Sequence, residues 1–264
     1  MSNVVQPLLI ANWKANLAPG EEVALAAQIS VQAAARRLSP GSLMIAPSMV
    51  GLVAVASLLR REHDALKIGI AAQDCSSDLA SAATGEIPAT HLLGAADAVI
   101  LGHSERRARG ESGSLIGAKL ARCVAAGIRP IVCLGDADPK ATESERCALV
   151  VRQWREALAG AAALGCDAAT VAASGVTLAY EPIWAIGSGQ AASPEVAAAV
   201  ARALRSKTSS SSLRILYGGS VDGRSAAGFL SATGEGSLNG LLIGGASLQA
   251  ERLLEIATAV GVAS

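Results

Sequence analysis

The chain has 264 residues, of which 51% are apolar and 17% charged, and its 22 Lys and Arg residues equal its 22 Asp and Glu residues. This balance excludes the one-signed electrostatic field that nucleic-acid-binding proteins usually carry, and the length suffices for a large core. The five cysteines, an odd number without C-x-x-C spacing, argue against a zinc or disulfide framework and favour the reducing cytoplasm.

The first 13 residues contain no Lys or Arg, so no basic region precedes an apolar one as in a signal peptide. Residues 21–38 then show the spacing of an amphipathic helix, with one face formed by Val23, Ala26, Ala27, Ser30 and Ala34. Residues 38–59 carry no charge, but Pro40, Pro47 and two glycines interrupt them. This segment predicts a loop, a strand and a helix rather than a membrane span.

Two further helices are predicted later in the chain. Residues 142–164 form a long amphipathic pattern whose outer face carries Arg146, Arg152 and Arg155. Ser193-Pro194-Glu195 has the signature of a helix start, with an N-cap serine, a proline at the first helical position and an acid in the first turn.

Short apolar runs recur about every 33 residues, the size of a βα unit. Each run is continuously apolar, as strands covered on both faces are. The eight runs cover residues 7–14, 42–48, 67–74, 98–104, 129–136, 177–184, 214–220 and 240–247. This uninterrupted series predicts an α/β fold, a single (β/α)8 barrel domain over residues 1–264. The alternative is an open doubly wound sheet, which usually has fewer strands and a G-x-G-x-x-G motif that is absent after the first run.

The C-terminal ends of the strands form the functional face of such a barrel. Polar and glycine residues follow the runs there: Asn12, Lys14, His103, Ser104, Asp136, Glu181, Gly218-Gly219-Ser220 and Gly244-Gly245. Singly, Lys14 could be a solvated charge, His103 a helix cap and Glu181 the partner of a buried arginine. The glycine pairs could be tight turns only. These structural interpretations need separate reasons for one location, so we interpret the set as an active site.

Glu181 is the only charge in A-Y-E-P-I-W-A-I-G-S-G, residues 179–189. Because Pro182 follows it, Glu181 is driven into extended geometry and its carboxylate is held at the strand end. The loop at 182–189 starts stiffly, ends in glycines and has an apolar underside. This is the composition of a lid that closes over a site and excludes water. Desolvation makes a carboxylate a better general base near neutrality.

Two turns offer backbone N–H groups to an anion, one at Ser220 and one at Gly244-Gly245. No side chain blocks close approach at the glycines, and residues 246–248 predict the start of a helix whose dipole favours negative charge. Barrel enzymes often bind phosphate after the seventh and eighth strands. The turns therefore predict a phosphate site.

The segments A-N-W-K, I-L-G-H-S-E-R-R, A-Y-E-P-I-W-A-I-G, Y-G-G-S-V and L-I-G-G-A-S-L resemble, in order, the signature segments of the triosephosphate isomerase family. The resemblance covers almost the whole chain. It implies interconversion of dihydroxyacetone phosphate and glyceraldehyde 3-phosphate through an enediolate, a step of glycolysis and gluconeogenesis. It implies no metal or organic cofactor.

The resemblance also assigns roles. Glu181 would be the catalytic base, a neutral His103 would polarise the carbonyl, and Lys14 would stabilise negative charge. The substrate would be held by Asn12, Lys14 and the backbone N–H groups of Gly187, Ser220, Gly244 and Gly245. Glu105 would support Lys14, and Ser104 would hold Glu181 while the lid is open.

Departures from the family concern first the surroundings of the site. Asp74 stands where the family usually has Asn, Asp136 where it has Glu, and Ser188 where it has Thr. None of these changes touches the reacting atoms.

A second group of departures concerns association. Family members are usually homodimers in which the loop that corresponds to residues 83–86 enters a pocket of the partner. Ala15, Ala83 and Arg109 replace a usual Met, a usual Phe and a usual apolar or aromatic residue. We therefore expect a cytoplasmic homodimer with a weakened or repacked interface, and no membrane or nucleic-acid partner.

Two alternatives to this function remain, an isomerase of a slightly larger phosphosugar and a catalytically silent barrel used for binding. The unaltered lid and the G-G-A-S-L turn favour the triose. The presence of Lys14, His103 and Glu181 argues against a silent barrel.

Overall fold

The computed structural model describes residues 6–62, 64–78, 83–187, 189–208, 213–232 and 234–264. Eight parallel strands close into a barrel in sequence order, and β1 pairs with both β2 and β8. The strands are β1 Leu8–Asn12, β2 Leu43–Ala46, β3 Gly69–Ala72, β4 Ala98–Leu101, β5 Arg129–Asp136, β6 Thr177–Pro182, β7 Arg214–Tyr217 and β8 Gly240–Ile243. The predicted (β/α)8 barrel is confirmed, and the open-sheet alternative is wrong.

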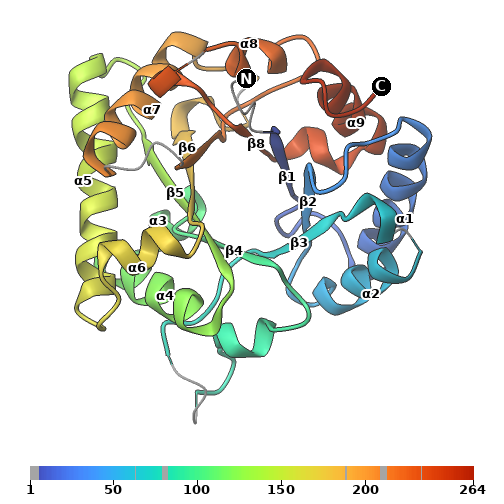
Figure 1. The fold of residues 1–264 in the computed structure, drawn as a ribbon, viewed down its shortest axis with the longest axis horizontal. Coiled ribbons are helices and arrows are strands. Elements are labelled where there is room, and N and C mark those ends of the chain that lie inside the picture. The colour runs from blue at the N-terminus through green and yellow to red at the C-terminus, as the bar shows by residue number, and fades with distance from the viewer. Residues whose placement is uncertain (1–5, 63, 79–82, 188, 209–212, 233) are drawn as a thin grey trace.

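Helices surround the strands as an outer ring (Figure 1). They are α1 Pro19–Ala35, α2 Leu52–Glu62, α3 Ser104–Ala108, α4 Gly113–Ala126, α5 Glu143–Ala162, α6 Ala168–Ala173, α7 Pro194–Thr208, α8 Ala226–Leu230 and α9 Ala250–Ala259. Single 3-10 turns are η1 Asp64–Leu66, η2 Ala89–Leu92, η3 Ile183–Ala185, η4 Gly234–Gly236 and η5 Gly245–Leu248. Among the helices so described, none is both long and apolar enough to cross a bilayer.

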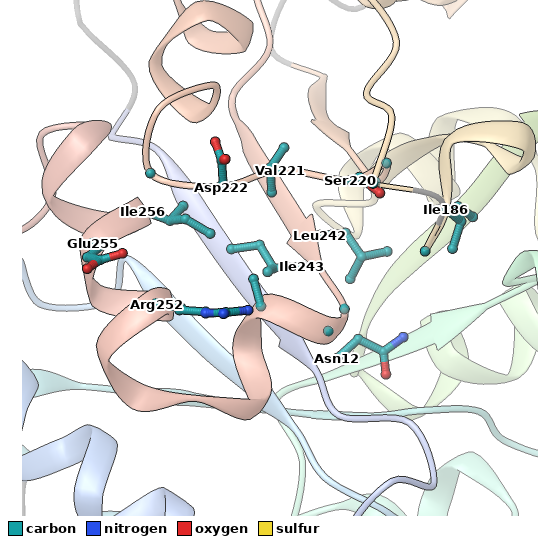
Figure 2. Close-up of a pocket in the computed structure, with 18 of the residues that line it drawn as sticks. Asn12, Ile186, Ser220, Val221, Asp222, Leu242, Ile243, Arg252, Glu255 and Ile256 are labelled. Carbon is teal, nitrogen blue, oxygen red and sulfur yellow. The ribbon is translucent and has the colours of Figure 1, made fainter.

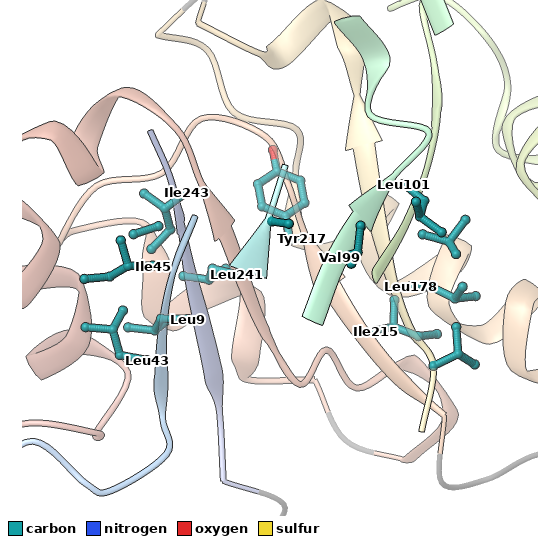
Figure 3. Packing of buried hydrophobic residues seen from close by; sticks show 14 of the residues in the cluster. Leu9, Leu43, Ile45, Val99, Leu101, Leu178, Ile215, Tyr217, Leu241 and Ile243 are labelled. Carbon is teal, nitrogen blue, oxygen red and sulfur yellow. The ribbon is translucent and has the colours of Figure 1, made fainter. Parts of the chain in front are cut away.

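The hydrophobic core has two layers, because successive residues of a strand point to opposite sides of the sheet. Leu9, Leu43 and Ile45 belong to the layer between barrel and helices, and Figure 3 shows them packed side by side. Leu8 and Ile10 belong to the inner cluster, which combines leucines and isoleucines with small or unbranched side chains such as Ala71 and Met44. A chain with 2% aromatic residues thus fills its barrel with aliphatic side chains.

The inner face predicted for residues 21–38 is partly wrong. The helix is α1, and its buried residues are Glu22, Leu25, Ala26, Ile29, Ser30 and Ala33, whereas Ala34 is exposed. Glu22 is buried because its carboxylate accepts hydrogen bonds from the backbone N–H and the hydroxyl of Ser48, the latter at 3.0 Å. These hydrogen bonds hold α1 in a rotation that places Glu22 inward, so its buried face differs from the face that the alanines suggested.

Arg146 was expected on the outer face of its helix, and this prediction is wrong. Its side chain on α5 is 4% exposed and pairs with the buried carboxylate of Asp136 at the end of β5. Arg152 and Arg155 are exposed, as predicted. The helix start is also as predicted, because Thr142 caps α5 and exchanges hydrogen bonds with Glu145.

Candidate active site

All eight residues predicted to form the site line one cavity of about 1020 Å³ at the C-terminal ends of the strands. Figure 2 shows two of them, Asn12 and Ser220, in the wall of this cavity. They come from β1, β6, the N-cap of α3, and the loops after β1, β6, β7 and β8. The cavity continues past the site along α9, where Figure 2 shows Arg252, Glu255 and Ile256. The barrel therefore gathers side chains that lie up to 233 residues apart in the sequence.

Glu181 lies near the end of β6 and is 2% exposed. Its Oε2 accepts a hydrogen bond from the backbone N–H of Ser104 at 2.9 Å, and its Oε1 is 3.0 Å from Nε2 of His103. The expected hold of Ser104 on Glu181 is thus made by the backbone rather than the hydroxyl. The carboxylate of Glu181 therefore contacts an imidazole and a backbone amide, and not the buried arginine that was considered as its partner from the sequence.

The neighbouring strand must carry a glycine opposite Glu181. Gly135 of β5 is its register partner, and a Cβ at Gly135 would lie 1.9 Å from the carbonyl oxygen of Glu181. The absent side chain lets β5 and β6 approach closely at the level of the carboxylate.

His103 caps a helix and also lines the cavity, so the structural interpretation is confirmed and its catalytic role stays a prediction. It is the N-cap of α3, where its Nδ1 accepts a hydrogen bond from the backbone N–H of Glu105 at 3.2 Å. Because Nδ1 accepts, the ring proton is on Nε2, which faces Glu181. This arrangement fits a neutral imidazole that presents an N–H donor to the cavity.

Lys14 has a left-handed backbone with φ of 54°, a conformation that non-glycine residues rarely adopt. Its N–H donates to Oδ1 of Asn12 at 3.1 Å, and its carbonyl accepts from Nε2 of Gln73 at 2.8 Å. Its Nζ lies 2.7 Å from Oε1 of Glu105, as the sequence suggested. Backbone outliers of this kind cluster at functional sites.

The charge of Glu105 responds to Lys14. Partial burial works to raise the pKa of this carboxyl, but the hydrogen bond and positive charge of Lys14 outweigh it and hold the pKa below its ordinary value. Glu105 is therefore an anion at neutral pH and gives Lys14 a fixed counter-charge.

The lid segment is attached at three points. Trp184 Nε1 donates to Asp136 at 3.1 Å, and the N–H and hydroxyl of Ser220 both donate to the carbonyl of Ala185, at 3.1 and 2.6 Å. Past the glycines, the N–H of Ala192 donates to the hydroxyl of Tyr217 at 2.9 Å. Gly187 and Gly189 have positive φ, of 66° and 74°, and Ser188 lies outside the described residues.

The turn after β8 differs from its prediction. Residues 246–248 do not begin a helix; they belong to the single 3-10 turn η5, and α9 starts at Ala250. The turn is fixed by Ser247, whose hydroxyl donates to the carbonyl of Gly244 at 2.6 Å. A Cβ at Gly245 would meet nothing within 4 Å, so that face is open to the cavity.

Two supporting residues were missed from the sequence. Gln73 bridges the carbonyls of Lys14 and Ala46. Cys133 is fully buried in the inner cluster, and burial together with the charge of Glu181 raises the pKa of its thiol well above the ordinary value. Cys133 therefore stays neutral beside the site. Its position in an apolar run gave no signal of this role.

Comparisons with known proteins agree along the whole length of the chain. A family model described as "TIM: Triosephosphate isomerase" matches residues 7–260. A triosephosphate isomerase of Leifsonia xyli subsp. xyli is 38% identical over 253 residues, which cover 92% of each chain. One of Acidiphilium cryptum is 38% identical over 96% of this chain and 98% of its own length. One of Rhodococcus jostii is 35% identical over 98% and 97%.

Proposed function

This chain belongs to the triosephosphate isomerase family and has its isomerase activity, and from that premise we propose that Glu181, His103 and Lys14 carry the reaction. The substrates are dihydroxyacetone phosphate and glyceraldehyde 3-phosphate. The observation that supports this assignment is the convergence of a carboxylate, an imidazole N–H and an ammonium on one cavity.

Proton transfer begins at Glu181. Its carboxylate removes a proton from the carbon next to the substrate carbonyl, and the electrons of that C–H bond form the enediolate. The protonated Glu181 then returns the proton to the neighbouring carbon. Because Oε1 is 3.0 Å from Nε2 of His103 in the unliganded site, the substrate must enter between the two groups and replace that contact.

His103 and Lys14 act on the oxygens. Nε2–H of His103 donates a hydrogen bond to the carbonyl oxygen and shuttles a proton between the two oxygens of the enediolate. The ammonium of Lys14 stabilises the negative charge that develops there, and Asn12 fixes the Lys14 backbone. Such groups are effective because they are oriented before the charge appears.

We assign the phosphate to the backbone N–H groups of Gly187, Gly244 and Gly245, and to that of Ser220, which must first give up its hydrogen bond to the carbonyl of Ala185. All four residues line the same cavity as the reacting groups, and glycines allow the close approach that a phosphate needs. Lys14 adds a positive charge at this end, since a Cβ on Gly244 would lie 3.9 Å from its Cε. The phosphate would thus anchor the substrate while its carbons face Glu181.

The lid over residues 182–189 has a protective function in this proposal. An enediolate exposed to water would lose its phosphate by elimination, so closure must exclude water during the transfer. The anchors at Asp136 and Tyr217 support a hinged segment, because they fix residues on both sides of Gly187 and Gly189.

Replacing Glu181 by Asp tests the assignment of the base. The shorter side chain withdraws the carboxylate by about 1 Å, and a displacement of that size can lower the rate by roughly 10²-fold. We expect kcat to fall by that factor or more while KM changes little, measured in a coupled assay with both triose phosphates.

Glu156→Asp is the matched control, because Glu156 is half-exposed on α5 and outside the cavity. It should keep the parent kcat. Unchanged turnover in Glu181→Asp would remove Glu181 as the base.

We also propose that the protein is a cytoplasmic homodimer. All five cysteines are free thiols, which fits a reducing compartment. Val50 and Val53, 80% and 63% exposed, form an apolar surface beyond the end of β2 that a partner subunit would cover. Ala15 and Arg109 are exposed as well, and neither supplies a large apolar contact.

A further inference from the structure

A second cavity, of about 300 Å³, lies at the opposite end of the barrel from the active site. Three of its lining residues, Arg129, Thr177 and Arg214, begin the neighbouring strands β5, β6 and β7. The rest of its wall comes from α5, α6, α7 and the segments that join them to the barrel, which lie along one side of the molecule (Figure 1). The isomerase site does not use any of these residues.

The charges of this cavity are all positive. Its lining includes Arg129, Lys207 and Arg214, and no carboxylate lies among the described residues that line it. Within the part of the chain that the structure describes, none of the three cations forms an ion pair. Burial lowers the pKa of Arg214, and the charge of Arg129 lowers it further. The two arginines therefore repel each other across a space that holds no counter-charge.

Trp154 lies in the wall of this cavity and can report on its occupancy. The side chain lines this cavity and is 4% exposed, yet its Nε1 has no hydrogen-bond partner among the described residues. A buried donor left unsatisfied costs about 1–3 kcal/mol, so such groups usually have a partner. That nitrogen has almost no accessible surface, so an acceptor inside the cavity does not reach it, and Trp154 belongs to the cavity wall through the rest of its indole.

The remaining wall is apolar and limits the size of a ligand. Leu158, Val171, Val176 and Leu213 contribute aliphatic side chains. A volume of about 300 Å³ lies at the lower end of the range for small-molecule sites, which is too small for a nucleotide. The cavity thus combines positive charge with a compact apolar surface.

We propose that this cavity is a binding site for a compact organic anion, whose acidic group lies between Arg129 and Arg214 and whose apolar body packs against Leu158 and Val171. The site is separate from the isomerase centre. Thr177 begins the strand on which Glu181 lies, and four residues of strand span about 13 Å. The proposal therefore stands or falls independently of the catalytic assignments.

The indole N–H groups offer a direct test, because the chain has three tryptophans in three settings. Selective ¹⁵N labelling of tryptophan gives one cross-peak each for Trp13, Trp154 and Trp184, and Trp154→Phe identifies the peak of Trp154. Benzoate is the probe, and benzamide is its uncharged counterpart of the same shape. We expect benzoate to shift the Trp154 peak saturably while the peak of Trp184, on the lid, stays in place.

Two variants test the role of charge. Arg129→Gln and Arg214→Gln should each weaken benzoate binding about tenfold or more, as expected for loss of a charge-assisted hydrogen bond. Arg155→Gln is the matched control, since it removes the same charge from an exposed position beside Trp154 that does not line the cavity.

Three results would overturn the proposal. They are equal shifts with benzoate and benzamide, unchanged benzoate affinity in both arginine variants, and no saturable shift of the Trp154 peak below about 10 mM benzoate. Lys207→Gln provides a third variant on an exposed side chain, in case either arginine variant folds poorly. Isomerase activity, measured in parallel, reports on the catalytic assignments alone.

Discussion

At the scale of single residues, the site depends on charges whose partners come from other parts of the chain. Lys14 after β1 is paired with Glu105 of α3, and Glu181 of β6 contacts the N-terminus of the same helix. α3 therefore orients both the ammonium and the carboxylate, although it has only five residues. Its effect on the reaction comes from position rather than from helix length.

Replacing Glu105 by Gln should make stability less dependent on pH. The pKa of Glu105 is lowered in the folded protein, so its contribution is present above the ordinary carboxyl pKa and is lost as the pH falls through the folded value. The Tm difference between the parent and Glu105→Gln should therefore be present at pH 7 and shrink as the pH falls below the ordinary carboxyl value of about 4.3.

Glu255→Gln is the control for this measurement, because Glu255 is exposed on α9. Its Tm difference from the parent should be small at every pH. A parent–variant difference for Glu105→Gln that grew on acidification would contradict the assigned sign.

Asp74 is predicted to behave in the opposite sense. Burial raises the pKa of its carboxyl and outweighs the ion pairs with Lys119 and Arg106. An acid with a raised pKa destabilises the fold at neutral pH, and this penalty disappears as the pH falls through that pKa. Asp74→Asn should thus raise Tm at pH 7 by about 2 °C or more, with no gain near pH 3. A lower Tm at pH 7 would show that the ion pairs dominate.

The residue types in the sequence predicted many residues of the candidate site, but they did not predict the residues that hold them in position. Asn12, Lys14, His103 and Glu181 could be predicted as site candidates because all four lie toward the ends of apolar runs. Gln73 and Arg146 could not, since their roles depend on partners that only the closed barrel brings near. The sequence spacing of α5 places Arg146 outward, whereas the buried carboxylate of Asp136 draws it inward.

At the scale of elements, the close approach of β5 and β6 positions the catalytic carboxylate. Gly135→Ala would push a methyl group into the backbone of Glu181, and overpacking of this kind typically costs about 1–3 kcal/mol. We expect a lower free energy of unfolding, measured in urea, together with reduced kcat, because the strands can part only by moving Glu181.

Gly20→Ala is the matched control for this substitution. A Cβ at Gly20 in α1 would meet nothing within 4 Å, and alanine favours helix over glycine by about 1 kcal/mol. This variant should be slightly more stable and fully active. Normal stability and kcat in Gly135→Ala would show that β5 and β6 can adjust without effect on the site.

Strands were easier to predict than helix faces for a physical reason. A strand of a parallel barrel is buried on both sides, so a continuous apolar run predicts it, whichever residues of the run face inward. The buried face of α1 depends on how the helix is rotated about its axis, and its many alanines do not reveal this rotation because they occur on both buried and exposed sides. Tertiary anchors such as Glu22 then decide which side faces the barrel.

At the scale of the whole molecule, closure of the barrel brings the segments that end or follow β1, β4, β6, β7 and β8 together around one cavity. This arrangement could be predicted because the strands are parallel and all their C-terminal ends share one face. The cavity at the other end could not, since the burial of Trp154 and the unpaired state of Arg214 depend on how the helices pack. Amino-acid composition alone predicts neither the shared face of the strand ends nor the second cavity.

Association of subunits gives a prediction at the same scale. Replacing a buried large side chain by alanine typically costs about 2–5 kcal/mol, so the alanines at positions 15 and 83 imply a weak interface. Sedimentation equilibrium at low micromolar concentration should reveal a population of monomers. Ala15→Met should restore apolar contact and shift the population toward dimers. An undissociated parent dimer would contradict the proposed weakening.

The pairing of β1 with β8 has a consequence for biosynthesis. Until β8 has been synthesised, β1 can hydrogen-bond only to β2, and its other edge offers unpaired backbone amides and carbonyls. The barrel can close only after Leu241 of β8 has been synthesised and has paired with Leu9 of β1. Nascent chains of this protein must therefore be sheltered longest at the strand that is synthesised first, and truncated products should be held by chaperones rather than released.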